Sequence, residues 1–134
     1  MIRDPDIYVT NGYDIHVTFT KEQREAALLL YDPFLNYLKK NRIEYRNHKI
    51  FDSPVGPWTT PMWQVILSQS KCVHQDLGKC ISWFMLNRGE LSVMVHPNTK
   101  EKNGLGGGYE DHSQNMLWLG EPRTLKLHIF DKKN

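Results

Sequence analysis

Alternation of apolar and polar residues predicts strands at two places in the chain, and each of these strands carries a histidine. In 13–19, YDIHVTF, the apolar side chains occupy every second position, which leaves Asp14 and His16 on the opposite face. In 91–99, LSVMVHPNT, the same alternation places His96 on the non-core face, directly before a proline that ends the pattern. Two predicted strands therefore each present an imidazole on the face that does not form the core.

Apolar residues at three- and four-residue spacing predict two helices. The first helix follows Thr20, which can form a capping box with Gln23, and we expect Pro33 to kink or interrupt it. The second ends before Gly89, a residue typical of the position just past a helix end. The buried stripes consist of Ala27, Leu30, Phe34, Leu35 and Leu38 in the first helix and of Val73, Leu77, Cys80, Ile81, Phe84 and Met85 in the second.

The remaining segments predict two more strands and several connections. Residues 43–51 and 62–67 have strand composition, and the Pro- and Gly-rich segment 52–61 between them must be a loop. The glycine run near the end of 100–108 lacks the spacing of a dinucleotide or phosphate-binding loop. We further expect an irregular lead-in at 1–11, a surface loop at 100–108, a short helical turn at 111–118 and a terminal strand or edge segment at 125–130.

The elements follow the order strand, helix, strand, strand, helix, strand, which predicts an α+β fold. The expected architecture is a ferredoxin-like βαββαβ sandwich with an antiparallel sheet and two helices on one face, formed by residues 1–134 as a single domain. The open face would collect Asp14, His16, Gln64, Met94 and His96. A partner subunit in a homodimer, or the segments flanking the core, should cover part of this face.

Composition and charge exclude several classes of protein. The chain has 134 residues, 40% of them hydrophobic and 24% charged, and its net charge of +2 is spread over scattered basic residues, which argues against nucleic-acid binding. We find no apolar run long enough to span a membrane and no signal-peptide pattern. Cys72 and Cys80 fit neither a zinc ribbon nor a thioredoxin-type pair. Two free thiols suit a reducing compartment, so we expect a cytoplasmic protein.

Two imidazoles and a carboxylate on a rigid sheet are the groups that a non-haem Fe(II) site requires. The candidate metal ligands are His16, His96 and Asp14, and either Asp14 or His112 can provide the third ligand. His112 lies in a later loop that can fold back over the sheet, so it can also serve as the general base. The simpler interpretation is that each histidine is hydrogen-bonded or solvated and that Asp14 caps the strand entry. We expect this ordinary role for His48, His74 and His128.

Several motifs in the correct order resemble the DOPA 4,5-dioxygenase family of small ring-cleaving dioxygenases. They are GYDIHVTF, the GP of VGPWTTPMWQV, NRGELSVMVHPNT, and a later DH followed by WLGEP. The resemblance runs from Gly12 to Pro122 and is most specific between Asn87 and Thr99. It implies a ferredoxin-like fold, dimers, and extradiol cleavage of a catechol with O2 and Fe(II). It points to three catalytic residues, namely His16, His96 and His112.

The chain departs from the family pattern at two positions. The family has a histidine after Gly-Pro where this chain has Trp58, and a glutamate where it has Gln64. We predict that Trp58, Gln64 and Arg88 bind the substrate, with Trp58 as an aromatic wall for the ring. The alternative is a catalytically impaired family member that serves as a small-molecule-binding or structural dimer.

Overall fold

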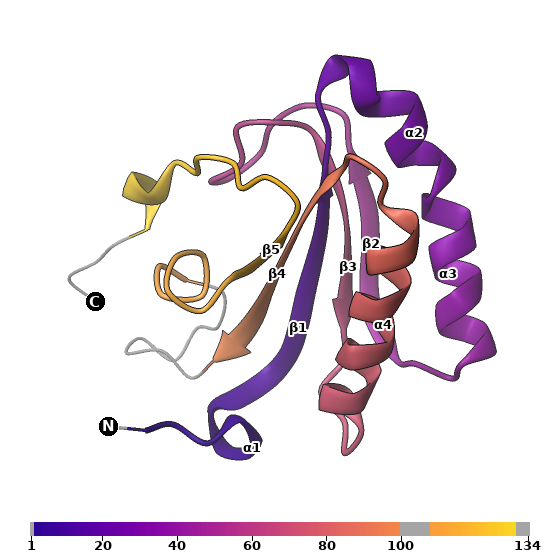
Figure 1. The fold of residues 1–134 in the computed structure, drawn as a ribbon. Helices are drawn as coiled ribbons and strands as arrows, with labels where there is room; N and C mark the ends of the chain where they lie inside the picture. The colour runs from indigo at the N-terminus through magenta and orange to yellow at the C-terminus, as the bar shows by residue number, and fades with distance from the viewer. Residues whose placement is uncertain (1, 100–107, 131–134) are drawn as a thin grey trace.

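The computed structural model describes residues 2–99 and 108–130, which form an antiparallel sheet with its longer helices on one face (Figure 1). The sheet has five strands in the order β2-β3-β1-β4-β5. The strands are β1 (Val9–Thr18), β2 (Tyr45–Phe51), β3 (Met62–Leu67), β4 (Ser92–Thr99) and β5 (Leu117–Leu119). The helices are α1 (Pro5–Tyr8), α2 (Arg24–Leu29), α3 (Tyr31–Lys40) and α4 (Val73–Asn87), with 3-10 turns at Lys21–Gln23 and Leu127–Ile129.

The first four strands and the helices between them confirm the predicted α+β, ferredoxin-like arrangement. Strand β1 lies at the centre and pairs antiparallel with both β3 and β4. Ile15 is opposite Val65 on one side and Val95 on the other, so apolar residues form a continuous row across the sheet. These residues pack against α3 and α4, and the Trp63 indole N–H donates to the Ala27 carbonyl at 2.8 Å.

The N-terminal part of β1 changes register at a glycine. The pairing with β4 shifts between Val9 and Tyr13, and Gly12 has a φ of +73°. A Cβ atom on Gly12 would lie 1.8 Å from the carbonyl oxygen of Leu67. The close approach of the two backbones therefore requires glycine here. The register that follows places Asp14 on the face opposite the helices.

The first predicted helix is present, with its capping box and with the expected interruption. The Gln23 side chain accepts from the Thr20 backbone N–H at 3.1 Å, as the predicted capping box requires. The helix is interrupted at Leu30, between α2 and α3, within one turn of Pro33. Pro33 has no backbone N–H to donate to the Leu29 carbonyl four residues earlier, and its ring crowds that carbonyl, so the interruption falls where the sequence predicts it.

Three of the predicted connections differ from the structure. The lead-in at 1–11 contains α1 and the start of β1, so it is not irregular. The predicted helical turn at 111–118 is a series of turns that ends in β5, which pairs with β4. The segment 125–130, predicted as a terminal strand or edge segment, contains a 3-10 turn at Leu127–Ile129. Its backbone bonds to the 52–61 loop, from Lys126 to Pro57, and among the described residues it pairs with no strand. Most of the loop predicted at 100–108 lies outside the described residues.

The chain itself covers part of the sheet face opposite the helices. Figure 1 shows the C-terminal segment on that side of β4 and β1. Met62 and Met94 are buried there beneath Trp58, in a cluster completed by Phe51, Met116, Trp118 and Leu125. The sequence leaves open whether a partner subunit or the flanking segments cover this face. Over this part of the sheet, the flanking segments do.

The two cysteines are free and differ in exposure. Cys72 is exposed at the start of α4, whereas Cys80 lies in the core, where burial raises the pKa of its thiol to about 12. Among the described residues, no helix is both long and apolar enough to cross a membrane.

Candidate metal centre

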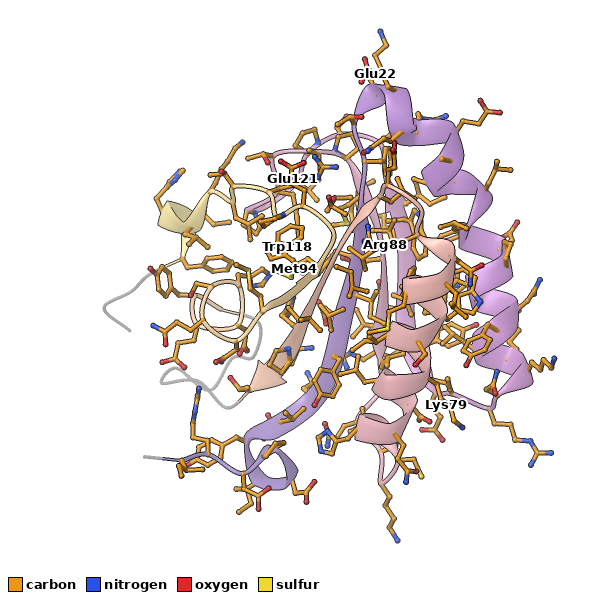
Figure 2. All side chains as sticks on the ribbon, in the orientation of Figure 1. Glu22, Lys79, Arg88, Met94, Trp118 and Glu121 are labelled. Atoms are coloured by element: carbon orange, nitrogen blue, oxygen red, sulfur yellow. The ribbon has the colours of Figure 1, made fainter. Side chains whose placement is uncertain are left out.

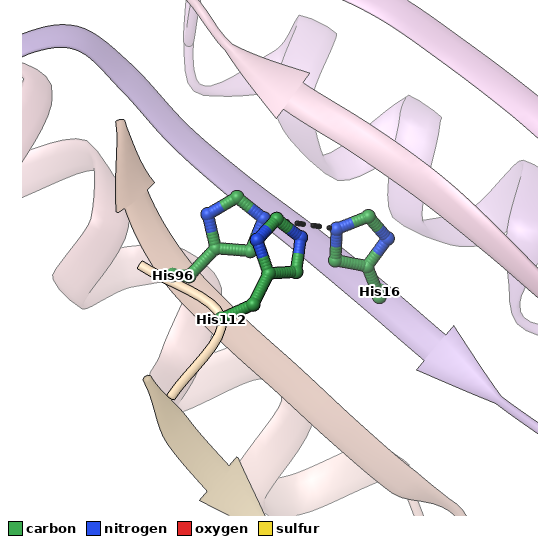
Figure 3. A group of neighbouring side chains, drawn as sticks. All are labelled: His16, His96 and His112. Atoms are coloured by element: carbon green, nitrogen blue, oxygen red, sulfur yellow. Dashed lines mark hydrogen bonds between the residues drawn. The ribbon is translucent and has the colours of Figure 1, made fainter. Parts of the chain in front are cut away.

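In the described part of the chain, three buried imidazoles meet on the sheet face opposite the helices (Figure 3). We call His16 from β1, His96 from β4 and His112 from the turn after β4 the imidazole cluster. Each residue offers one ligand nitrogen, and these atoms lie within 4.8 Å of one another. The Nε2 atoms of His16 and His96 are only 3.3 Å apart. All three side chains are buried, with 3%, 1% and 8% exposure.

Strand register and one buried carboxylate bring the imidazole cluster together. His16 is opposite Met94 on β4, so His96, two residues further along, is its diagonal neighbour on the same face. The Asp111 carboxylate accepts hydrogen bonds from the Thr99 backbone N–H at 2.9 Å and from its hydroxyl at 2.8 Å. These bonds fix the turn of residues 109–115 to the end of β4, and His112 follows Asp111 directly.

Hydrogen bonds at Nδ1 orient two of the rings. His96 Nδ1 donates to the Pro97 carbonyl at 2.9 Å, and His112 Nδ1 donates to the Gly108 carbonyl at 3.0 Å. A carbonyl only accepts, so both rings carry their proton on Nδ1, and each Nε2 lone pair can accept a hydrogen bond or bind a metal. His16 Nδ1 is buried and has no hydrogen-bond partner among residues 2–99 and 108–130. The neutral His16 therefore carries its proton on Nε2 when it donates to His96, and metal binding would shift that proton to Nδ1.

Asp14 supplies negative charge to the cluster. Its Oδ2 atom lies 3.6 Å from His16 Nε2 and 3.5 Å from His96 Nε2, and its Oδ1 accepts from the Asn98 amide at 2.7 Å. Burial raises the pKa of the Asp14 carboxyl, but hydrogen bonding from His16 and Asn98 and the attraction of the imidazoles outweigh it and hold the pKa far below its usual value. Asp14 is thus ionised at neutral pH and faces the cluster.

Burial keeps the imidazoles neutral. It lowers the pKa of His16 and of His96, although the negative charge of Asp14 opposes the shift in both. It lowers the pKa of His112 to about 4, with a further contribution from His96. Metal ligands must be deprotonated, so all three rings are in the form that coordinates a metal at neutral pH.

Two aromatic rings enclose the imidazole cluster. The Trp58 ring centroid lies 4.4 Å from that of His16 and 6.3 Å from that of His112. Phe130 stacks on His112 at 4.8 Å with an interplanar angle of 30°. The sequence pattern did not indicate Phe130, because it lies in the segment that we predicted as a terminal strand. The 52–61 loop and the C-terminal segment together thus exclude water from the rings.

The other two predicted substrate-binding residues occupy different places. Gln64 is directly opposite His16 on β3, and its amide donates to the Asn47 side chain at 3.0 Å. Arg88 follows α4 and donates to the carbonyls of Gly89 and Leu91 at 3.2 and 3.1 Å. Figure 2 shows Arg88 beside the end of α4, whereas Met94 and Trp118 lie on the other side of β4. The structure thus places Gln64 next to the cluster and Arg88 among loop carbonyls.

The groups present fit a divalent transition metal. Neutral imidazoles with free lone pairs, an adjacent carboxylate and a buried ring nitrogen without a partner form a suitable donor set. His48 and His74, by contrast, are hydrogen-bonded to tyrosine hydroxyls, as expected for ordinary histidines.

Three comparisons relate the chain to known proteins. The family model of the Dopa 4,5-dioxygenase family matches residues 13–129. An uncharacterized 21.2 kDa protein of Botryotinia fuckeliana is 29% identical over 125 residues, which are 92% of this chain but only 66% of that relative's length. The crystal structure of a proposed dioxygenase from Nostoc punctiforme PCC 73102 aligns with a TM-score of 0.73 and 28% identity over 95% of both chains.

Proposed function

Since this chain belongs to the DOPA 4,5-dioxygenase family, we propose that it is an extradiol ring-cleaving dioxygenase that acts on a DOPA-like catechol with O2 and Fe(II). The observation that carries the proposal is the imidazole cluster beside the ionised Asp14. A dioxygenase of this kind needs a metal site with protein ligands on one side and room for the substrate and O2 on the other.

His16, His96 and His112 would hold the metal, and Asp14 would offset its charge. We predicted from the sequence that Asp14 is a ligand, with His112 as the alternative. The three imidazole nitrogens lie within 4.8 Å of one another, so we propose His112 as the third donor, and Asp14, at 3.5–3.6 Å from two of them, is close enough to be an additional ligand. When bound, Fe(II) supplies a Lewis acid for the catechol oxygens and an electron path to O2. Asp14 can also accept a hydrogen bond from a catechol hydroxyl, because it is ionised and only partly buried.

The neighbouring side chains would orient the substrate. Trp58 offers an aromatic surface against which a catechol ring can stack. Gln64 lies across the strand pair from His16 and offers an amide that both donates and accepts. Burial of the cluster keeps bulk water away from the reacting groups.

Metal analysis and a turnover assay test the proposal together. Protein reconstituted anaerobically with Fe(II) should consume O2 and convert DOPA or a simpler catechol into a coloured ring-opened product. His96→Ala should lose metal and turnover, whereas the control His48→Ala should keep both, since His48 bonds to Tyr31 away from the cluster. Parent protein that binds no divalent metal at neutral pH would contradict the proposal.

His112→Ala separates the two roles that remain for His112. A ligand role predicts that metal binding falls sharply. A general-base role predicts that metal binding survives while the turnover rate falls by about a hundred- to ten-thousand-fold.

One observation favours the alternative of an impaired family member that binds small molecules or serves as a structural dimer. The indole of Trp58 lies against His16 and brings no basic nitrogen to the cluster. A protein that binds metal and catechol but gives no ring-opened product under Fe(II) and O2 would support this alternative.

Assembly and location are further parts of the proposal. We propose a homodimer that covers the part of the open face formed by β2 and β3, where Asn47 and Lys49 are exposed. Sedimentation velocity at micromolar concentration should show the dimer, and a monomer at every concentration tested would contradict it. We propose a cytoplasmic location on the basis of the two free thiols.

A further inference from the structure

Residues 2–8, which we call the N-terminal arm, lie outside the range matched by the family model. The arm contains α1, whose first turn is capped by the Asp4 side chain. The Asp6 carboxylate lies 3.1 Å from Nε2 of His74, and the other nitrogen of His74 lies 2.8 Å from the Tyr13 hydroxyl. These contacts anchor the arm to α4 and β1, and Figure 1 shows it below the end of β4.

Arg3 extends from the anchored arm to the turn that carries His112. One guanidinium nitrogen lies 3.2 Å from the Glu110 carboxylate, and another donates to the Asn115 side-chain oxygen at 3.0 Å. Glu110 and Asn115 stand on either side of His112 in the 109–115 turn. A single two-pronged side chain thus joins both ends of the turn.

The contact continues inward to buried groups. The Asn115 amide donates to the Asp111 carboxylate at 2.9 Å, and the fully buried Asp111 holds Thr99 at the end of β4. His112 is the next residue, and its backbone N–H donates to the Gly108 carbonyl within the same turn. Arg3 is therefore connected to the imidazole cluster through one amide and one carboxylate.

We propose that Arg3 is a positioning residue for His112, and that the N-terminal arm thereby sets the metal affinity of the imidazole cluster. The inference rests on the proposed metal centre. Arg3 and Glu110 are 38% and 50% exposed, so their ion pair alone has a small effect. Loss of a group that orients a metal ligand has a larger effect, because it lowers the affinity for the metal. We therefore expect Arg3→Ala to weaken metal binding about three- to tenfold.

The matched control is Arg24→Ala, which removes another exposed two-pronged arginine, one paired with Asp52 and not with the 109–115 turn. Co(II) titration followed by absorption reports affinity and the ligand set without any turnover. Hydrogen exchange of the metal-free protein reports directly on the turn, through the amides of His112 and Asn115. Arg3→Ala should weaken Co(II) binding and speed exchange at both amides, and Arg24→Ala should do neither.

Two further variants distinguish positioning from a general loss of charge. Arg3→Lys keeps the charge near Glu110 but cannot reproduce the two-pronged geometry, so its Co(II) affinity should lie between those of the parent and Arg3→Ala. Asn115→Ala should weaken binding at least as much as Arg3→Ala. The double variant with Arg3→Ala and Asn115→Ala should then bind Co(II) about as well as Asn115→Ala alone, because both changes break the same connection to the turn.

The outcomes separate this inference from the proposed function. If His112→Ala loses Co(II) but Arg3→Ala binds it like the parent, the inference is overturned and the metal centre stands. If the parent binds no metal, the proposed function fails, and the part of the inference that concerns affinity fails with it. Equal exchange rates in Arg3→Ala and Arg24→Ala would overturn the positioning of the turn itself.

Discussion

Trp58 is the residue at which the chemistry of this chain departs furthest from the family pattern. Its side chain is 3% exposed and lies against His16. An indole has one N–H donor and no basic lone pair, so it can neither ligate a metal nor accept a proton. Trp58 therefore contributes an apolar surface where the family pattern places a histidine.

Trp58→His tests how much activity is lost because tryptophan occupies the position of the family histidine. If the family histidine acts as a base, the variant should gain about a hundred- to ten-thousand-fold in ring cleavage, measured as the coloured product under Fe(II) and O2. Trp58→Phe is the control, because it keeps an aromatic surface without a lone pair. Equal turnover in both variants would show that the side chain at position 58 does not transfer a proton.

The sequence located the candidate site residues unevenly. Strand alternation placed His16, His96 and Asp14 on one face, because a side-chain period of two is a property of any strand. His112 lies in a turn without such a period. Its place in the loop after the strand of His96 made it a candidate, and the family resemblance then pointed to it. Phe130 and Arg3 reach the site through contacts between segments far apart in the chain, and no local pattern encodes those contacts.

Strand β1 is the element that determines the position of the site, and its course depends on Gly12. The strand pairs with both of its neighbours over Tyr13 to Thr18 and carries His16 of the imidazole cluster and the adjacent Asp14. The positive φ of Gly12 lets the chain pass the Leu67 carbonyl before this pairing begins.

We predict that Gly12→Ala lowers the free energy of unfolding by at least about 2 kcal/mol, because the positive φ is strained for alanine and its Cβ would overlap Leu67. Gly78→Ala in α4 is the matched control. A Cβ there meets nothing within 4 Å, so the change should stabilise the protein by about 0.5–1 kcal/mol. Urea denaturation measures both, and a similar effect of the two substitutions would contradict the role of Gly12.

Elements with a clear period were predicted correctly, and those set by distant contacts were not. The alternation in 13–19 and 62–67 and the stripes of α3 and α4 each indicate a buried face. β5 has three residues and exists because β4 offers it an edge. The segment 125–130 alternates equally well, yet its backbone bonds to the 52–61 loop instead of to a strand.

The molecule as a whole should be sensitive to acid when it contains no metal. Each buried imidazole has a lower pKa in the folded than in the unfolded protein, where it is about 6.5. The unfolded state therefore binds more protons as the pH falls below about 6.5, and stability present above that pH is lost below it. The loss through His112 continues down to about pH 4. The lowered pKa of Asp14 also makes the protein less stable as the pH falls, but only below the unfolded pKa of this carboxyl, about 4.

We expect the free energy of unfolding to fall by about 1.4 kcal/mol per pH unit for each imidazole that stays neutral, measured by denaturation with a chelator between about pH 6 and pH 5. His112→Asn should reduce this slope by about 1.4 kcal/mol per pH unit, which is the contribution of one proton. A parent protein whose stability is flat across this range would show that the buried rings are not neutral.

The different exposure of Cys72 and Cys80 makes it possible to measure how often α4 separates from the sheet. A thiol reagent should modify Cys72 at once in the native protein, since it is exposed at the start of α4. Cys80 is buried and its thiol pKa is raised to about 12, so it can react only after α4 separates from the sheet. Its modification rate, divided by that of a free thiol, therefore measures the equilibrium for that separation. Mass spectrometry after timed labelling should find one modified thiol early and a second at a rate that Gly12→Ala accelerates and metal slows.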